Sequence, residues 1–409
     1  MEEGQARQRK TLNQTATSLA TVREIMTEFA ALTGLSPAGK TTRRYLWTDA
    51  FAVCNFLDLY RQTRDVEYMR LALGLVDQVH NTLGKYREDD PRSGWISGLG
   101  EEDGRRHPTI GGLRIGKKLN ERRPGVPFDE RLEWDRDGQY YHYLTKWMHA
   151  LSCVGRTTGD AKYNGWAIEL AKTAHAKFTY RPSYGGRKRM FWKMSIDLSY
   201  PLVSSMGHHD PLDGYVAYLQ LQAAAKRFDS PPQPDLYAEI ADMAGMCEEK
   251  SWITDDPLGI GELLVNACKA TQLIVNDDAQ LSDLLEDIVE SSVPGLEAYT
   301  RGNPLKLHAD YRLPFREFGL SIGLRAVQRM HALVQRKTET FNKRPSLHSG
   351  IRYLIQYLPL SETIENFWLE SGNREGSSWR EHHDINMVML ATSLAPDGYL
   401  KLNPDPDDS

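Results

Sequence analysis

The sequence predicts an all-α protein, an (α/α)6 barrel of helical hairpins with two long loops over one end, and three observations support this fold class. Apolar residues recur with helical spacing along most of the 409 residues, and few stretches alternate with the period of a strand. Residues 57–83 align without a gap on residues 152–178, which indicates a helical hairpin stacked on copies of itself. Helices that are apolar almost all round alternate with amphipathic ones, as buried and surface helices do.

The two copies of the repeat share residues at the turn and along the second helix of the hairpin. The coinciding pairs are Arg61/Arg156, Thr63/Thr158, Asp65/Asp160, Tyr68/Tyr163, Ala72/Ala167, Leu75/Leu170 and His80/His175. The unit is therefore two helices joined by a short turn such as Thr158-Gly159-Asp160. Because His80 and His175 recur at equivalent positions of an outer helix, a structural role is expected for both.

Inner and outer helices are expected to alternate along the chain. The inner helices are predicted at Leu46–Arg61, Gln139–Gly155, Leu212–Lys226, Ile260–Ile274, Phe315–Leu333 and Ile385–Leu394. The outer helices are predicted at Val66–Leu83, Ala161–Phe178, Pro234–Glu249, Asp278–Glu290 and Pro345–Leu358. The N-terminal helix, about Thr11–Leu32, supplies a further outer partner and should pack beside the C-terminal helix.

This alternation predicts a single barrel domain over residues 1–395, followed by an exposed tail at residues 396–409. An open superhelix of hairpins is the alternative. It is less favoured because the terminal helices lack the polar outer face that a capping repeat needs.

Composition and charge exclude several classes of protein. The net charge of −5 gives no sign of nucleic-acid binding, and no apolar run suggests a membrane span or a signal peptide. The cysteines Cys54, Cys153, Cys247 and Cys268 are scattered singly in helical patterns without CxxC spacing, so reduced core thiols are expected. We therefore expect a cytoplasmic protein without nucleic-acid or membrane partners, and the oligomeric state is left open.

Two connections are far longer than packing requires, at residues 84–138 and 179–211. Both join an outer helix to the next inner helix, so both should lie at the same end of the barrel as binding loops or lids. Their basic residues suit an anionic substrate such as a uronate, or equally a solvated surface. These residues are Arg105, Arg106, Lys117, Lys118, Arg122, Arg123, Arg187, Lys188 and Arg189.

Acidic, aromatic and histidine side chains gather where the inner helices begin. Carboxylates bind sugar hydroxyls and flat aromatic rings cover a pyranose face, so a carbohydrate fits such a site. A single Asp there is more often a helix cap, but capping needs no aromatic or histidine neighbour. The predicted substrate-binding residues are Trp47, Asp49, Trp134, Gln139, His142, His209, Arg316, Glu317, Trp379, His383 and Asp384.

The catalytic candidates are three aspartates and two histidines. In the dense segment 133–151, one of Asp135 and Asp137 is expected to cap the helix and the other to act on the substrate, with Asp210 as a further carboxylate. His208 and His382 each stand in an HHD triplet and are candidate bases. Adjacent histidines point apart on a helix and no HExxH pair is present, so neither a metal nor another cofactor is expected.

The alternating helices, the segment WDRDGQYYHYLTKW at residues 134–147 and the acidic starts of the inner helices resemble the six-hairpin glycosidase-like superfamily. That superfamily includes unsaturated glucuronyl hydrolases, glucoamylase-like hydrolases and, in a related barrel, N-acylglucosamine 2-epimerases. The resemblance to the hydrolases implies two catalytic carboxylates from inner-helix starts. The resemblance to the epimerases implies two histidines from facing helices as acid and base.

The leading hypothesis is a glycoside hydrolase acting on a sugar or a uronic-acid-containing glycoside. One Asp donates a proton to the leaving oxygen, and a second activates water or attacks the sugar. The second hypothesis is a sugar epimerase or isomerase that uses His208 and His382, or their neighbours His209 and His383, because histidine titrates near neutral pH. A lyase or cyclase on the same helical barrel is the third. For the cyclase, Asp255-Asp256 lacks a third acid at the right spacing.

Overall fold

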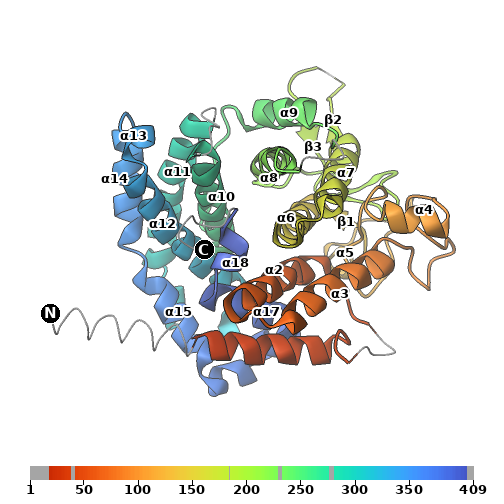
Figure 1. Cartoon of the computed structure of the whole chain (residues 1–409), viewed down its shortest axis with the longest axis horizontal. Coiled ribbons are helices and arrows are strands. Elements are labelled where there is room, and N and C mark those ends of the chain that lie inside the picture. The colour runs from red at the N-terminus through yellow and green to blue at the C-terminus, as the bar shows by residue number, and fades with distance from the viewer. Residues whose placement is uncertain (1–17, 38–41, 184, 229–232, 276–280, 403–409) are drawn as a thin grey trace. The chain divides into compact units, whose positions relative to one another are not determined.

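The computed structural model describes residues 18–37, 42–183, 185–228, 233–275 and 281–402 (Figure 1). It divides into two compact units, where a single domain was expected from the sequence. One comprises residues 38–54 and 70–252, which include both long loops, and is called the loop unit. The other comprises residues 1–37, 55–69 and 253–409 and is called the C-terminal unit.

The loop unit is built on helical hairpins whose first helix is buried. Its helices are the first half of α2 (Leu46–Thr63), most of α3 (Val66–Leu83), α4 (Glu101–Arg106), α5 (Glu130–Asp135), α6 (Tyr141–Thr158), α7 (Ala161–Phe178), α8 (Asp210–Ala225) and α9 (Tyr237–Cys247). The inner helices α6 and α8 pack against each other and each packs against its outer partner, α7 or α9. Most residues of α6 and α8 are buried, as their continuous apolar patterns predict.

The C-terminal unit repeats the same alternation. After a helix over residues 18–32, its helices are α10 (Pro257–Val275), α11 (Ser282–Arg301), α12 (Pro314–Arg336), α13 (Thr338–Phe341), α14 (Pro345–Ile355), α15 (Pro359–Leu369), α16 (Ser377–Glu381), α17 (His383–Leu394) and α18 (Asp397–Leu400). Short 3-10 helices lie at Pro304–Lys306, Ala309–Tyr311 and Ser371–Glu375. The all-α class is confirmed, and both units show the alternation that an (α/α)6 barrel of helical hairpins requires.

The sequence repeat corresponds to a repeated capping structure. Asp65 and Asp160 each accept a hydrogen bond from the backbone N–H two residues later, at 3.0 Å, and so start α3 and α7. Thr63 and Thr158 each accept a bond at 3.2 Å from the N–H of that aspartate. A side-chain oxygen at a helix start satisfies an otherwise unpaired N–H, which explains why these residues recur.

Glycines let two buried helices of the C-terminal unit approach closely. A Cβ on Gly261 of α10 would lie 2.0 Å from the carbonyl oxygen of Gly319 on α12. A Cβ on Gly323, one turn further along α12, would lie 2.6 Å from the Cα of Gly261. The contact is between backbones, so neither helix has a flexible side chain that can move aside.

The helix over residues 18–32 packs beside α17, as predicted, because Ile25 and Glu28 share a cavity of about 370 Å³ with Met387 and Leu390. Residues 11–17 of the predicted helix lie outside the described residues. Three predictions need correction. The outer helix predicted at Asp278–Glu290 is α11, which begins at Ser282, continues through Pro294 and ends at Arg301. The outer helix predicted at Pro345–Leu358 ends at Ile355, and Pro359 begins a separate helix, α15. The tail expected to be exposed from residue 396 forms α18 and remains packed as far as residue 402.

Hydrogen bonds hold the chain end in place. The Nε2 of Gln272 on α10 donates to the carbonyl oxygen of Leu400 at 2.8 Å, and its Oε1 accepts from the N–H of Leu402 at 2.9 Å. Leu400 is 1% exposed and Leu402 is 6% exposed. The segment that follows α17 is therefore part of the core of the C-terminal unit, whereas residues 403–409 lie outside the described part of the chain.

The strands are few and short, and they belong to the loop unit. The strands β1 (Gln139–Tyr140), β4 (Lys193–Met194) and β5 (Pro201–Val203) form an antiparallel sheet in the order β1-β4-β5. A hairpin pairs β2 (Thr179–Tyr180) with β3 (Arg189–Met190). Because Gln139 pairs with Met194 immediately before α6, the sheet fixes the second long loop beside the start of an inner helix.

Among the described residues, one helix is long and apolar enough to cross a membrane. This is α10, and 78% of its most apolar window is buried inside the protein. A core helix of a helical protein has the same composition because it is enclosed on all sides.

Candidate active site in the loop unit

The two long loops are tied to one another by buried and half-buried ion pairs. Arg92 of the first loop donates to Asp197 of the second at 2.9 Å and to Glu121 of its own loop at 2.5 Å. Lys193 donates to Glu133 at 2.9 Å with its ammonium group buried. These contacts hold the loops as a fixed part of the unit, where the sequence had suggested binding loops or lids.

Asp137, a leading catalytic candidate from the sequence, is a fully buried anchor for the first loop. Its Oδ2 accepts a hydrogen bond from Arg114 at 2.9 Å and lies 3.5 Å from a guanidinium nitrogen of Arg87. Its Oδ1 accepts from the N–H groups of Gly116 and Gly138, at 2.9 and 3.1 Å. With both oxygens bonded to the protein, this carboxylate is arranged to hold a loop.

Other predicted residues near Asp137 also have structural partners or lie at the surface. Gln139 is buried and bonds to the backbone of Leu113 at 2.8 Å and of Ile196 at 2.7 Å. Asp49 accepts from the N–H of Tyr45 at 2.9 Å and pairs with Arg44 at 3.2 Å, which makes it a buried cap. Asp135 is exposed, and Trp134 is 52% exposed with Lys117 over its ring.

Asp210 and His142 are neighbouring groups of this unit that each have a buried polar atom without a hydrogen bond in the described part of the chain. Asp210 begins α8 and is 4% exposed, and its Oδ1 lies 3.6 Å from Nδ1 of His142 on α6. Within the described residues, Oδ2 of Asp210 and Nδ1 of His142 make no hydrogen bond. A Cβ on Gly207 would lie 2.3 Å from Oδ2 of Asp210, so a side chain at position 207 would displace this carboxyl group. Buried polar atoms without partners are costly, which makes this pair a candidate for substrate contact.

Burial sets the protonation of this pair. It raises the pKa of Asp210 to about 8, with the nearby charge of Asp213 adding to the shift, because the charged carboxylate is poorly solvated. It lowers the pKa of His142 to about 3, because the imidazolium is poorly solvated too. At neutral pH the carboxyl group is therefore protonated and the imidazole is neutral. Opposed shifts of two neighbouring groups are typical of acid–base sites.

Aromatic rings surround His142. The ring centroids of Trp47, Tyr140, Tyr143 and Trp192 lie 6.0, 5.3, 4.9 and 6.4 Å from that of His142, and the Trp192 ring is stacked parallel to it. His142, Tyr143 and Trp192 are half-buried, so this wall is partly accessible. The sequence analysis selected Trp47 and His142 but did not select Trp192, which is brought to the wall by the β4 strand of the second loop.

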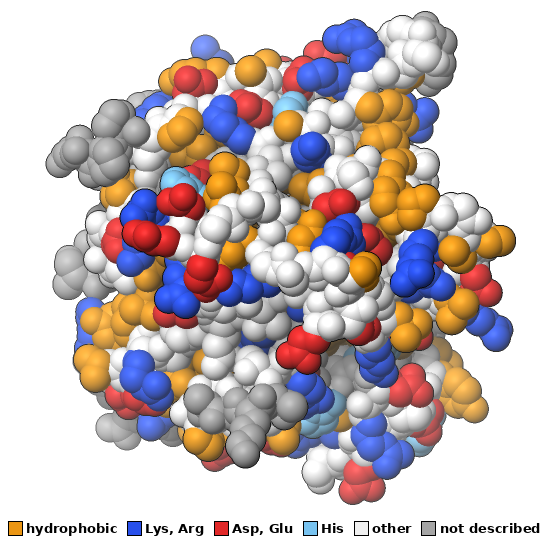
Figure 2. Space-filling view, turned by 90° about the vertical axis from the view of Figure 1, so that its right-hand side faces the viewer, with side chains coloured by type: hydrophobic (Ala, Val, Ile, Leu, Met, Phe, Trp, Pro, Cys, Tyr) orange, Lys and Arg blue, Asp and Glu red, His pale blue; other side chains and the backbone are white. Residues whose placement is uncertain are grey.

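The basic loop residues are mostly paired with neighbouring acids. Arg106 pairs with Glu102 and Asp103, and Arg122 with Glu133 at 3.0 Å. Figure 2 shows the same pattern on the face that it presents, where Lys and Arg side chains alternate with Asp and Glu and form no continuous basic area. Lys117 packs on aromatic rings: its ammonium group lies over the rings of Tyr45 and Trp134, at 5.3 and 5.0 Å. Burial lowers the pKa of Lys117 to about 8.

The first HHD triplet ends at Asp210, the first residue of α8. His208 is exposed, and its ring centroid is 4.6 Å from that of His209. The Nε2 of His209 lies 3.3 Å from the carbonyl oxygen of Trp252, and burial lowers the pKa of His209 to about 4. His209 is therefore a half-buried neutral group held against Trp252, while His208 lies at the surface directly before the start of α8.

The remaining predicted site residues belong to the C-terminal unit. Glu317 is buried between Arg312, at 2.8 and 2.6 Å, and the indole N–H of Trp368, at 2.8 Å. The other predicted residues of this unit have close neighbours as well. Arg316 pairs with Asp256 at 2.6 Å, Trp379 stacks on Trp368, His382 meets the ring of Phe315 edge-on, and His383 lies 3.5 Å from Asp384.

No family model and no curated protein matches the sequence. Several solved structures are similar. A sugar epimerase from a ruminal bacterium is 11% identical, with 86% of this chain and 88% of that chain covered and a TM-score of 0.44. A cellobiose 2-epimerase from Spirochaeta thermophila is 13% identical, with 84% and 98% covered and a TM-score of 0.43. A cellobiose 2-epimerase from Bacillus thermoamylovorans is 10% identical, with 77% and 76% covered and a TM-score of 0.41.

Proposed function

We propose that the chain is a carbohydrate-processing enzyme that moves a proton on a reducing sugar, as an epimerase or isomerase. The observation that carries the proposal is the Asp210–His142 pair: a buried carboxyl group that is protonated at neutral pH beside a neutral imidazole, each with an unsatisfied polar atom. The half-buried rings of Tyr143 and Trp192 supply flat apolar surface of the kind that covers a pyranose face.

The two groups have complementary roles in such a reaction. Epimerisation beside a carbonyl group needs a base to remove a proton from the carbon and an acid to donate one to the carbonyl oxygen. Asp210 supplies the proton for the oxygen, and the neutral imidazole of His142 accepts the proton from carbon. The step leaves an imidazolium beside a carboxylate. The net charge of the pair is then unchanged, which limits the cost of burying charge.

Hydrolysis of a glycosidic bond is the second candidate. The raised pKa of Asp210 also suits a general acid that protonates a leaving oxygen. Such a mechanism needs a second available carboxylate, and Asp137 is bonded at both oxygens while Asp213 pairs with Lys146 at 3.1 Å. We therefore rank hydrolysis below proton transfer. A lyase or cyclase stays the third candidate, as in the sequence analysis.

The histidine pair considered from the sequence, His208 and His382, belongs to two different units of the structure. A role for His382 stays a prediction. The proton-transfer proposal depends on the loop unit alone, because Asp210, His142 and the aromatic wall all belong to it.

The test is an exchange experiment in heavy water. The purified protein is incubated with a panel of reducing mono- and disaccharides, cellobiose included, and the recovered sugars are analysed by NMR. Deuterium on the carbon beside the carbonyl group, together with a new epimer or isomer and no cleavage, is the expected result. Cleavage of aryl glycosides or unsaturated uronides without any deuterium uptake would contradict the proposal and favour hydrolysis.

A further inference from the structure

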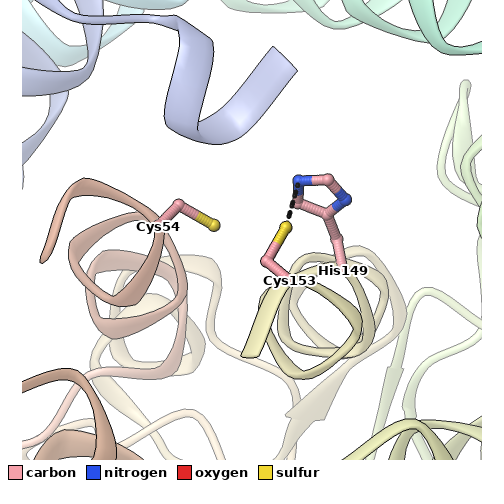
Figure 3. Close-up of side chains that lie close together, drawn as sticks. All are labelled: Cys54, His149 and Cys153. Atoms are coloured by element: carbon pink, nitrogen blue, oxygen red, sulfur yellow. Dashed lines mark hydrogen bonds between the residues drawn. The ribbon is translucent and has the colours of Figure 1, made fainter. Parts of the chain in front are cut away.

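A second cluster of reactive side chains lies in the core of the loop unit, away from Asp210 and His142. It consists of Cys54 on α2 and of His149 and Cys153 on α6 (Figure 3). All three residues are buried, with at most 2% of their surface exposed. His142 and Cys153 are eleven residues apart on one helix, which corresponds to about 16 Å at 1.5 Å per residue. The cluster is therefore separate from the candidate active site.

The three side chains converge on one point. One ligand atom from each, two sulfurs and an imidazole nitrogen, lies within 4.8 Å of the other two. The Nε2 of His149 is 3.6 Å from the Sγ of Cys153, because residues four apart on a helix face the same side. Ligands on a tetrahedral zinc ion lie about 3.5–4 Å apart, given bonds of about 2.3 Å to sulfur and 2.0 Å to nitrogen. Binding of an ion therefore requires only that the more distant atoms move closer by up to about 1 Å.

The other ring nitrogen of His149 has the partner expected in a metal site. Its Nδ1 lies 3.0 Å from the Oε1 of Gln220 on α8, an oxygen that can only accept a hydrogen bond. Nδ1 therefore carries the proton, and the lone pair of Nε2 faces the sulfurs. Histidines that bind metals usually donate the other N–H to such an acceptor, which fixes the tautomer and the orientation of the ring.

From this geometry we propose that Cys54, His149 and Cys153 bind one thiophilic metal ion, of the zinc(II) or copper(I) class. Two thiolates and an imidazole, without an oxygen donor, suit these ions and disfavour magnesium and calcium. The guanidinium group of Arg156, 3.5 Å from the Sγ of Cys153, lowers the cost of holding thiolate charge in the core. Three protein ligands complete a trigonal copper(I) site or leave one position open on zinc(II).

The first test measures metal binding by the full-length protein. The protein is prepared under reducing conditions, stripped with a chelator and titrated anaerobically with cobalt(II), as a spectroscopic substitute for zinc, and with copper(I) in a competing chelator. One ion per chain is expected, with sulfur-to-cobalt charge-transfer absorption or with copper(I) retained against the chelator. The titration that gives stoichiometric binding identifies the class of ion. Absence of binding in both the cobalt(II) and the copper(I) titration overturns the proposal.

Variants assign the ligands. Cys54→Ser, Cys153→Ser and His149→Ala should each lose the charge-transfer band and bind at least about ten-fold more weakly, since even residues outside the ligand set contribute about 10–100-fold. Cys268→Ser, at another fully buried cysteine on an inner helix, should bind like the wild type. Loss of binding in Cys268→Ser, or wild-type binding in Cys153→Ser, contradicts the assignment.

Gln220 is a positioning residue and has its own test. Gln220→Leu should weaken binding about 10–100-fold, and Gln220→Glu, which still accepts the Nδ1–H of His149, should restore it. Equal weakening in both variants would contradict the proposed tautomer.

A measurement on the wild type covers the case in which a variant fails to fold. With metal present, Cys54 and Cys153 should resist alkylation in mild denaturant while Cys247 and Cys268 react. Equal alkylation of all four, or a disulfide between Cys54 and Cys153 in place of metal, overturns the site. Neither result bears on the sugar chemistry.

Discussion

At the scale of single residues, the structure separates aspartates that look alike in the sequence. Asp49 and Asp137 are buried and bonded to arginines and backbone N–H groups, whereas Asp210 is buried beside a neutral histidine with one oxygen unsatisfied. Burial without a partner raises the pKa of Asp210 to about 8. Burial with a guanidinium partner makes a structural ion pair.

The unusual pKa of Asp210 predicts how stability depends on pH. The folded chain keeps this proton up to about pH 8, while the unfolded chain releases it near pH 4. Between these pH values the carboxyl group therefore lowers the free energy of unfolding by about 1.4 kcal/mol for each unit by which the pH rises. This loss of stability is absent below about pH 4 and reaches its full size above about pH 8. Asp210→Asn removes it, so the variant should gain stability over the wild type as the pH rises from 5 to 8.

Urea unfolding of both proteins at pH 5, 6, 7 and 8 measures this difference. The matched control is Asp135→Asn, which makes the same substitution at an exposed position. A constant difference for Asp210→Asn would show that the carboxyl group is already ionised at neutral pH.

At the scale of elements, close helix packing depends on specific glycines. Gly261→Ala places a methyl group 2.0 Å from the backbone oxygen of Gly319, so α10 and α12 must move apart. We expect a loss of several kcal/mol in the free energy of unfolding, or failure to fold, because overpacking between backbones has no cheap relief. Thermal and urea unfolding, followed by circular dichroism, measure the effect.

Gly245→Ala is the control for this experiment. Gly245 lies in α9 with nothing within 4 Å of the Cβ position. Alanine there should stabilise the chain by about 0.5–1 kcal/mol, because it reduces the freedom of the unfolded state. A Gly261→Ala variant as stable as Gly245→Ala would refute the close contact between α10 and α12.

The sequence predicted long helices well and short elements poorly. Val66–Leu83 and Ala161–Phe178 are confirmed to the residue, because each begins at an Asp cap that is visible in the sequence. The break between α14 and α15 was missed, although Pro359 signals a new helix start. Strands of two or three residues are too short to show a period of two.

The candidate site was only partly predictable for a different reason. Helix starts identified His142 and Asp210, but the role of Asp137 depends on Arg114 and Gly116 in a long loop whose path no local pattern gives. Trp192 reaches the wall through strand pairing in the second loop. The His149–Cys153 spacing of four on a helix was visible, but Cys54, the third member of that cluster, is distant in sequence.

At the scale of the whole chain, truncation shows whether the C-terminal segment contributes to the core. A chain that ends at residue 395 loses the buried Leu400 and Leu402 and leaves the side-chain amide of Gln272 without these partners. We expect it to be destabilised by several kcal/mol. A chain that ends at residue 402 keeps these contacts and is the matched control. Equal stability of both truncations, measured by urea unfolding, would contradict a packed chain end.

The central claim is that Asp210 transfers a proton and Asp137 holds the fold. It is tested most directly by measuring deuterium exchange into an accepted sugar substrate, alongside urea unfolding, for Asp210→Asn and Asp137→Asn. We predict that Asp210→Asn loses at least about 100-fold in exchange rate, the usual contribution of a general acid, while it folds at least as stably as the wild type at pH 8. Asp137→Asn should lose about 3–5 kcal/mol of stability by leaving Arg114 poorly paired, and its folded fraction should retain exchange. The reverse pattern, with exchange lost in a stable Asp137→Asn and kept in Asp210→Asn, would contradict the account.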